Sequence, residues 1–273
     1  MNMTIIGCGY VGFAVAKLWN QKMTFLVTAT TTTPERLITL QTVAQRSLLL
    51  KTNDAEGLKS VVKNQDVVLL SIGSKTGSTY EETYLETAKT LVPVLQKSGV
   101  KQLLYTSSCS VYGDQNGRLV DEDTPIFPTS HNSQILAETE QLLLSVSNDN
   151  LKVCILRLGG IYGLGRELVK IYGRIAGTTR PGTGEEPANW IHLDDIVAGI
   201  EFARKHHLQG IYNLVDDAYL SNREIIDKVC ETHNLEKVRW DASQPSVRAY
   251  NARISNQKIK GAGYKLVHPQ MIF

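Results

Sequence analysis

The chain has 273 residues, with 29 basic and 27 acidic side chains and a formal net charge of +2. This balance excludes the basic footprint of a nucleic-acid-binding protein and favours a soluble protein that binds a small molecule. The first residues carry no targeting leader, and no apolar run approaches the roughly 20 residues needed to cross a bilayer, so we expect a cytoplasmic protein without a membrane partner.

Apolar, β-rich runs alternate with helical segments through the first half of the chain. The runs occupy residues 3–7, 24–30, 65–73, 101–108 and 152–160, and segments with helical spacing lie at 11–21, 34–45 and 81–99. Such alternation indicates βαβ units, and continuous apolar runs are typical of buried parallel strands. We therefore predict an α/β fold with a doubly wound parallel sheet of the Rossmann type.

The second half has a different character. Residues 178–190 read as a loop, residues 190–207 begin as strand or loop and become helix, and residues 210–215 form another apolar strand. The segments 221–234 and 255–269 are mixed. We expect a dinucleotide-binding domain at 1–158 and a small, partly interleaved C-terminal substrate lobe at 159–273, with the strand near 210–215 returning to the first domain.

The stretch "TIIGCGYVG" places Gly7, Gly9 and Gly12 in a G-x-G-x-x-G pattern between a strand and a helix. In this pattern the first glycine permits the tight turn, the second lets a pyrophosphate approach, and the third brings the helix close to the sheet. Tyr10 and Val11 then begin the helix whose positive end faces the pyrophosphate. This stretch predicts dinucleotide binding.

The end of the second strand, "VTATTTTPERL", lacks the acidic residue that would bind a ribose 2′-hydroxyl. Hydroxyls of Thr30 and Thr31 and the guanidinium of Arg36 suit a 2′-phosphate, which slightly favours NADP over NAD. An alternative is that the threonines are an ordinary strand end and Arg36 a solvated helix residue. Further cofactor contacts are expected at Asp54, Ser71 and Gly73.

"YTSSCSVYGD" follows at the carboxyl end of a strand, where doubly wound sheets bind ligands. With it, the chain resembles the extended short-chain dehydrogenase/reductase family, which includes nucleotide-sugar epimerases and dehydratases. The resemblance covers nearly the whole chain and rests on "GCGYVG", "SSCSVYG", "LRLGGIYGLG", "WIHLDDIV" and "GIYNLVDD".

The resemblance implies roles for several residues. Ser108 would hydrogen-bond the reacting carbonyl or alcohol oxygen, and Arg157, Tyr162 and His192 would lie in or near the substrate pocket. Tyr112, by its place after the strand, would put its hydroxyl in the same crevice. Tyr162 and His192 have an alternative role, in which they pack between the lobes.

In this family a helix opens with Tyr-x-x-x-Lys followed by x-x-Ala-Glu, where the tyrosine is the acid/base and the lysine lowers its pKa. The segment "PTSHNSQILAETEQLL" supplies Ala137 and Glu138, and counting back places Gln134 at the lysine position and Ser130 at the tyrosine position. Gln134 would then face the nicotinamide ribose. His131 is the candidate substitute acid/base; the alternative is a surface residue at the helix start.

Two functions remain open. The retained substrate-lobe motifs favour an NAD(P)-dependent oxidoreductase or epimerase acting on a small substrate such as a sugar nucleotide. The missing tyrosine and lysine favour a non-catalytic NAD(P)-binding sensor or regulatory module. We also expect a homodimer through the helices at residues 80–96 and from residue 130, although their apolar stripes also suit covering the sheet.

The four cysteines, Cys8, Cys109, Cys154 and Cys230, are scattered without paired spacing. Neither a metal site nor a disulfide framework is therefore expected. Cys109 neighbours Ser108, but nothing nearby in the sequence activates its thiol, and we expect it to fill space in the core.

Overall fold

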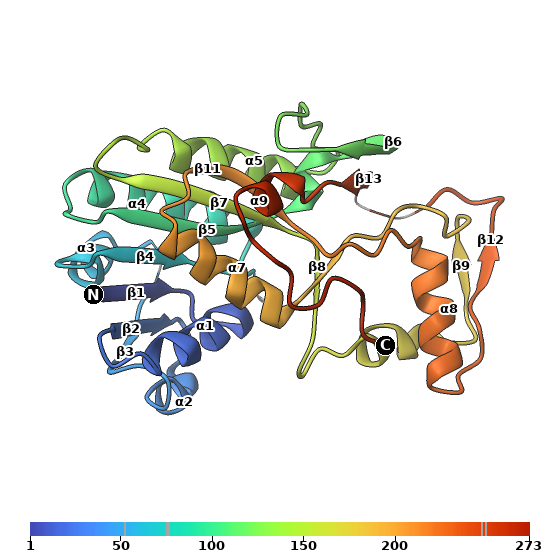
Figure 1. Ribbon diagram of the computed structural model, residues 1–273, viewed down its shortest axis with the longest axis horizontal. Helices are drawn as coiled ribbons and strands as arrows, with labels where there is room; N and C mark the ends of the chain where they lie inside the picture. Colours follow the sequence, from blue (N-terminus) through green and yellow to red (C-terminus); the bar gives the residue numbers. More distant parts are fainter. Residues whose placement is uncertain (52, 75–76, 247, 249) are drawn as a thin grey trace. The chain divides into compact units, whose positions relative to one another are not determined.

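The computed structural model describes residues 1–51, 53–74, 77–246, 248 and 250–273 (Figure 1). Its main element is a seven-stranded sheet with the order β11-β7-β5-β4-β1-β2-β3. Parallel pairing joins β3 to β2, β2 to β1, β1 to β4 and β4 to β5. The strands are β1 (Asn2–Ile6), β2 (Leu26–Thr31), β3 (Arg46–Leu49), β4 (Val67–Leu70), β5 (Gln102–Ser108), β7 (Lys152–Leu158) and β11 (Gly210–Leu214).

The strand order reverses beside β1. The chain runs outward through β2 and β3 and then returns to β4 on the other side of β1. A ligand crevice forms at such a switch point, outside the carboxyl ends of the strands. The predicted doubly wound parallel sheet is confirmed, and the strand predicted near 210–215 is β11 of this sheet.

Helices cover the sheet because each has an apolar stripe. Side chains of α3 (Ala55–Val62), α4 (Glu86–Gln96) and α5 (His131–Leu144) share one core cluster with β4, β5 and β7. α1 (Tyr10–Asn20) contacts α7 (Leu193–Lys205) through Trp19, whose indole N–H donates to Glu201 at 2.9 Å.

The apolar stripes expected to pair two copies of the chain are largely buried within one copy. Ala88, Leu91 and Leu95 of α4 and Leu143 of α5 all belong to the core cluster. The stripes therefore cover the sheet, and the homodimer stays a prediction.

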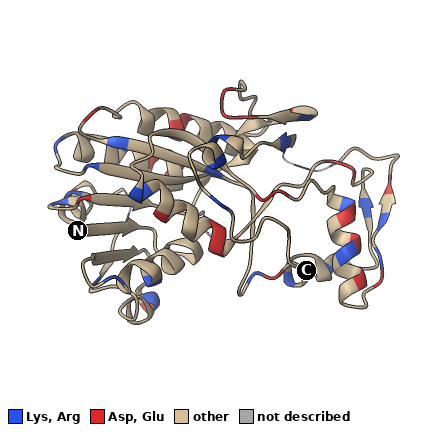
Figure 2. Ribbon diagram, viewed as in Figure 1, with Lys and Arg blue, Asp and Glu red and all other residues tan. Residues whose placement is uncertain are grey.

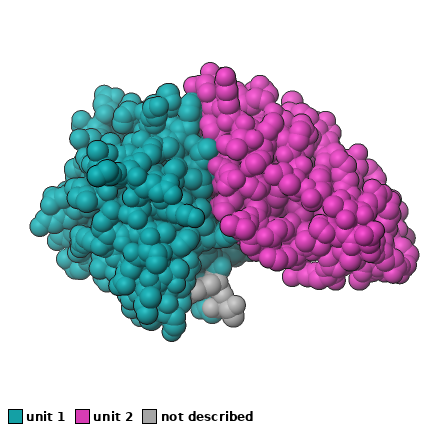
Figure 3. Space-filling view, turned by 60° about the horizontal axis from the view of Figure 1, so that its bottom comes forward, with its two compact units in different colours: residues 1–107, 131–157, 197–212 teal, residues 108–130, 158–196, 213–273 magenta. Residues whose placement is uncertain are grey.

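The chain forms two compact units, which Figure 3 shows in different colours. Unit 1 comprises residues 1–107, 131–157 and 197–212, and unit 2 comprises residues 108–130, 158–196 and 213–273. Compactness alone does not locate a domain boundary, so the division at residues 158/159 stays a prediction.

Unit 2 is built from short elements. Three two-stranded parallel pairs join β6 to β13, β8 to β10 and β9 to β12. The elements are β6 (Asp114–Val120), β8 (Gly160–Tyr162), α6 (Leu168–Tyr172), β9 (Thr179–Pro181), β10 (Trp190–His192), α8 (Asn222–Thr232), β12 (Arg239–Asp241), β13 (Asn251–Ile254) and α9 (Gln257–Gly261).

Local structure departs from the sequence expectations in two places. The helix expected at 34–45 shrinks to a 3₁₀ turn and α2 (Leu37–Leu40), after which the chain turns into β3. The mixed segment 221–234 contains the regular helix α8. Its start is a capping box, in which Ser221 and Glu224 each bind the other's backbone N–H.

Basic and acidic side chains are interspersed over most elements, and α8 carries both signs (Figure 2). Across the described residues, no helix combines the length and the apolar character that crossing a bilayer would require.

Candidate functional site

The glycine turn between β1 and α1 requires glycine at its first and third positions. Gly7 has φ +83°, and a Cβ there would lie 2.7 Å from the carbonyl oxygen of Ser71. A Cβ on Gly12 would lie 2.9 Å from the carbonyl oxygen of Gly7, so α1 packs directly on the turn. Both glycines meet the steric needs of a Rossmann turn.

Gly9 occupies a different environment. Apart from Gly9 itself and its neighbours along the chain, no described atom lies within 4 Å of the position that a Cβ on Gly9 would take. Gly9 is also the N-cap of α1 and has no side chain to accept from the first-turn N–H groups, which begin at Tyr10 and Val11. Open space beside the positive end of a helix is the setting that binds a pyrophosphate.

The two threonines predicted to contact the cofactor are buried at the end of β2. The hydroxyl of Thr30 accepts from the Gly7 N–H at 3.3 Å, and its carbonyl oxygen accepts from the Cys8 N–H at 2.8 Å. The hydroxyl of Thr31 accepts from the Thr33 N–H at 3.1 Å. Thr30 therefore holds the backbone of the glycine turn through its hydroxyl and its carbonyl oxygen.

The charge of Arg36 acts on the Cys8 thiol of the glycine turn. Burial raises the pKa of the Cys8 thiol to about 12, and the Arg36 guanidinium acts in the opposite direction. The charge of Arg36 thus reaches the middle of the turn. A guanidinium placed there suits an anionic ligand such as a 2′-phosphate.

The remaining predicted cofactor residues follow later strands of unit 1. The Asp54 carboxylate accepts from the Gly57 N–H at 3.0 Å and caps α3, which accounts for an aspartate there without a ligand. The Ser71 hydroxyl accepts from Thr106 at 3.2 Å, while Gly73 is exposed.

A buried ion pair that the sequence did not predict lies in unit 1. The Arg157 guanidinium donates to both carboxylate oxygens of Glu140, with a shortest N···O distance of 2.7 Å. Ser107 donates to the same carboxylate at 2.5 Å. Arg157, predicted to lie near the substrate, is 3% exposed and engaged with Glu140. The helical spacing of Glu140 could have indicated its burial, since it shares the buried face of α5 with Ser133, Leu136 and Leu143.

The first turn of α5 carries two of the predicted catalytic positions. His131 and Gln134 are both exposed there, whereas the neighbouring Ser133 is buried. Ser130, at the predicted tyrosine position, precedes the helix and is half-buried.

Ser108 is the last residue of β5 and caps the 3₁₀ turn Cys109–Tyr112. Its hydroxyl accepts from the Ser110 N–H at 3.2 Å, which leaves its own O–H as a donor. Tyr112 is fully buried, and its hydroxyl donates to Asn213 at 2.9 Å. Cys109 is buried, as are the other three cysteines.

Tyr162 and His192 lie side by side in unit 2. Their rings meet edge to face, with centroids 5.1 Å apart, and the Tyr162 hydroxyl accepts from the Ile272 N–H at 3.2 Å. Burial raises the pKa of Tyr162 to about 12. Burial lowers the pKa of His192, and the nearby His268 lowers it further, against the opposing effect of Asp194.

Asp216, at the end of "GIYNLVD", is a buried carboxyl group that the sequence did not single out. It lines a small cavity with Asn189, Tyr219 and Arg253. One carboxyl oxygen accepts from the Ala218 N–H at 3.0 Å, and within the described residues the other has no hydrogen-bond partner. Burial raises the pKa of Asp216 to about 7.

Comparison with known proteins identifies relatives. Residues 3–214 match the model of the NAD dependent epimerase/dehydratase family. Protein YeeZ of Escherichia coli K12 is 27% identical over 250 residues, which cover 89% of this chain and 88% of the relative.

Two solved structures share the fold. The dTDP-glucose 4,6-dehydratase DesIV of Streptomyces venezuelae, a double mutant with NAD bound, has a TM-score of 0.81 at 19% identity, covering 97% of this chain and 92% of the other. Human epimerase family protein SDR39U1, solved with NADPH, has a TM-score of 0.78 at 17% identity, covering 99% and 96%.

Proposed function

The chain belongs to the NAD dependent epimerase/dehydratase family, and from that premise we propose that it binds NAD(P) at its glycine turn and acts on a sugar nucleotide as an oxidoreductase or epimerase. The observation that carries this proposal is the difference between the three glycines. Gly7 and Gly12 are needed by the fold itself, whereas the fold leaves the space beside Gly9 open. That space is where a Rossmann turn receives the pyrophosphate.

NADP is the cofactor that we propose is preferred. The end of β2 has no carboxylate to accept from a ribose 2′-hydroxyl, and the charge of Arg36 reaches the glycine turn. A carboxylate at this place would repel a 2′-phosphate, whereas a guanidinium attracts one.

The proposed chemistry uses Ser108 and His131. A nicotinamide cofactor held at the glycine turn would supply hydride transfer to or from a substrate carbon. Ser108 donates its O–H to the reacting oxygen, and His131 moves the proton that the missing tyrosine would otherwise carry. Ser130 and Gln134 fill the tyrosine and lysine positions, and an alkyl hydroxyl beside an uncharged amide is a poor acid.

Four residues are proposed to form the substrate pocket, one by contact with the substrate and three as buried support. His192 is only partly buried and can face a ligand, whereas Tyr112, Arg157 and Tyr162 are buried and hydrogen-bonded within their own units. We propose that these three residues support the pocket rather than touch the substrate.

The alternative function is a sensor that binds NAD(P) without turnover. One observation favours it: none of the eleven tyrosines is followed four residues later by lysine. A positioned general acid contributes about 10²–10⁴-fold to rate, so a protein without one can retain binding and lose most catalysis.

Product analysis separates the two functions. Purified protein is incubated with NAD or NADP and with dTDP-glucose or UDP-glucose, and the sugar nucleotides are separated by chromatography. We expect a new sugar nucleotide with the wild type and a reduced rate with Ser108→Ala. Cofactor binding without any product across the panel would support the sensor and contradict the enzyme.

A further inference from the structure

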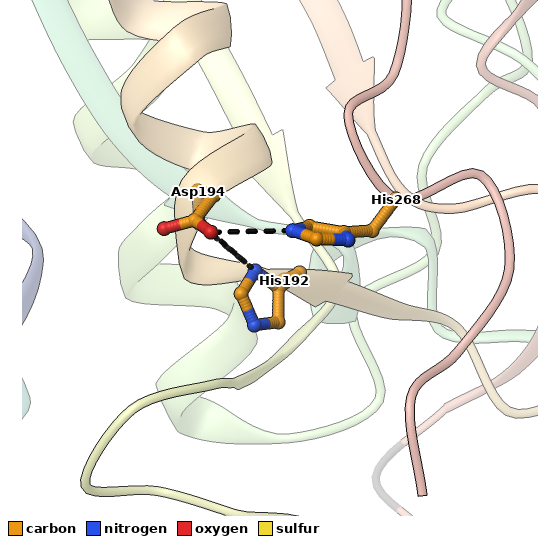
Figure 4. Close-up of side chains that lie close together, drawn as sticks. All are labelled: His192, Asp194 and His268. Atoms are coloured by element: carbon orange, nitrogen blue, oxygen red, sulfur yellow. Dashed lines mark hydrogen bonds and ion pairs between the residues drawn. The ribbon is translucent and has the colours of Figure 1, made fainter.

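We propose that His192, Asp194 and His268 form a binding site for a divalent transition-metal cation of the zinc type. The three side chains come from the end of β10, the first turn of α7 and the C-terminal tail, and all belong to unit 2 (Figure 4). Each offers one ligand atom, and these atoms lie within 4.8 Å of one another. This site shares His192 with the residues proposed to serve the substrate, and its test measures metal binding alone.

The distances suit a small cation. Asp194 Oδ2 lies 3.2 Å from His268 Nε2 and 3.5 Å from His192 Nδ1. Zinc binds nitrogen and oxygen at about 2.0–2.2 Å with tetrahedral angles, which places neighbouring ligand atoms about 3.3 Å apart. Asp194 Oδ2 already lies at about this distance from each imidazole, whereas the two imidazole nitrogens, which lie within 4.8 Å of each other, would move closer on a common cation.

The nitrogen of His192 that faces Asp194 is an acceptor. His192 Nδ1 accepts from the Asp194 backbone N–H at 3.2 Å, so it is the unprotonated nitrogen of the ring. The Asp194 carboxylate oxygen near it is also an acceptor. A cation bound here would take the Nδ1 lone pair in place of the backbone N–H and coordinate both acceptors.

The site is held in place by the neighbouring carboxylate. Asp195 is fully buried and accepts from the backbone N–H groups of Val267 and His268, at 2.6 and 2.9 Å, and from the Tyr264 hydroxyl at 3.0 Å. These bonds fix the backbone of His268 opposite Asp194. Such outer contacts orient metal ligands and raise affinity.

The ligand set selects the class of cation. Two imidazoles and one carboxylate suit zinc, cobalt, nickel or copper, whereas magnesium and calcium prefer oxygen ligands alone. The Asp194 side chain is 62% exposed, so solvent can fill the remaining coordination positions. Binding would tie the C-terminal tail to the start of α7 and stabilise the folded chain.

The test uses untagged, chelator-treated full-length protein, titrated with Zn²⁺ by calorimetry and with Co²⁺ by visible absorption. For the wild type we expect one Zn²⁺ site per chain. The visible spectrum of the Co²⁺ form should be that of a cobalt ion with a low coordination number. His268→Ala and Asp194→Asn should bind Zn²⁺ at least about tenfold more weakly, because removal of a ligand exceeds the effect of an outer contact. Zn²⁺ should raise the melting temperature only of proteins that keep all three ligands.

His233→Ala is the matched control, since this exposed histidine of unit 2 ends α8 and is not one of the three proposed ligands. It should bind like the wild type. Asp194→Asn keeps the size of the side chain, and circular dichroism verifies that each variant is folded. Equal Zn²⁺ affinity in all four proteins, or equal binding of Mg²⁺ and Zn²⁺ by the wild type, would overturn the proposal.

Discussion

The Gly7 backbone N–H donates to the Thr30 hydroxyl at 3.3 Å, so the strand β2 holds the first glycine of the turn that begins the proposed cofactor site. The Thr30 carbonyl oxygen adds a second bond, from the Cys8 N–H at 2.8 Å. Thr30, which is predicted to contact the cofactor, therefore also supports the shape of the turn.

Replacement of Thr30 by valine removes the hydroxyl and keeps the branched shape. We expect Thr30→Val to weaken NAD(P) binding about fivefold, because one such hydrogen bond contributes about 1 kcal/mol. Calorimetric titration measures the effect. Thr4→Val is the control, since the Thr4 hydroxyl donates to the Val61 carbonyl away from the turn. An equal loss of NAD(P) affinity in both variants would contradict the role of Thr30 in the turn.

Arg36→Gln tests the cofactor preference. The wild type should bind NADP more tightly than NAD at moderate salt. The variant should lose about three- to tenfold in NADP affinity and little in NAD affinity, since the proposed partner of the guanidinium is the 2′-phosphate, which NAD lacks. Tighter binding of NAD than NADP by the wild type would contradict the assignment.

Glu140→Gln tests the buried ion pair. The variant leaves the Arg157 charge buried with a neutral partner, and the side chains of the pair are only 2% and 4% exposed. We expect a loss of about 3–5 kcal/mol in the free energy of unfolding, measured by chemical denaturation. Glu138→Gln changes an exposed residue of the same helix and should have little effect. Similar stability of the two variants would show that the pair does not matter.

Asp216 makes stability depend on pH. Burial raises its pKa in the folded protein to about 7, above the ordinary 3.8, so between these values the folded protein binds more protons than the unfolded chain. The free energy of unfolding therefore contains the full contribution of Asp216 below about pH 4. This contribution is lost as the pH rises to about 7, which lowers the free energy of unfolding by up to about 4 kcal/mol.

Asp216→Asn should remove this dependence. Unfolding free energies at pH 5 and pH 8 should differ less in the variant than in the wild type, and at pH 8 the variant should be the more stable protein. Asp149→Asn, at an exposed position, should behave like the wild type. If the free energy of unfolding of Asp216→Asn depends on pH as strongly as that of the wild type, then ionisation of Asp216 does not destabilise the folded protein.

Local patterns explain what the sequence predicted. The glycine turn and the apolar strands depend on neighbouring residues, so the fold and the candidate pyrophosphate site could be predicted together. The capping box of Ser221 and Glu224 is equally local, and the pattern S-x-x-E before an apolar run was a usable signal for α8.

Contacts between distant segments explain what the sequence did not predict. Tyr112 and Asn213 are 101 residues apart, and nothing in the motif around Tyr112 indicates that its hydroxyl is buried against β11. Asp194 and His268 are 74 residues apart, and the buried Asp195 is one of the groups that hold the tail beside Asp194. Cysteine spacing could not reveal a site made of histidines and a carboxylate.

The central claim, that the glycine turn binds a dinucleotide, is tested most directly by NAD(P) titration of Gly9→Leu. The space beside Gly9 is open among the described atoms, so the variant should melt like the wild type while its side chain blocks the pyrophosphate. Gly7→Ala, whose Cβ would collide with Ser71 and Ile72, should instead destabilise the fold. We expect no measurable NAD(P) binding by a folded Gly9→Leu protein, and equal affinity of this variant and the wild type would contradict the assignment of this turn.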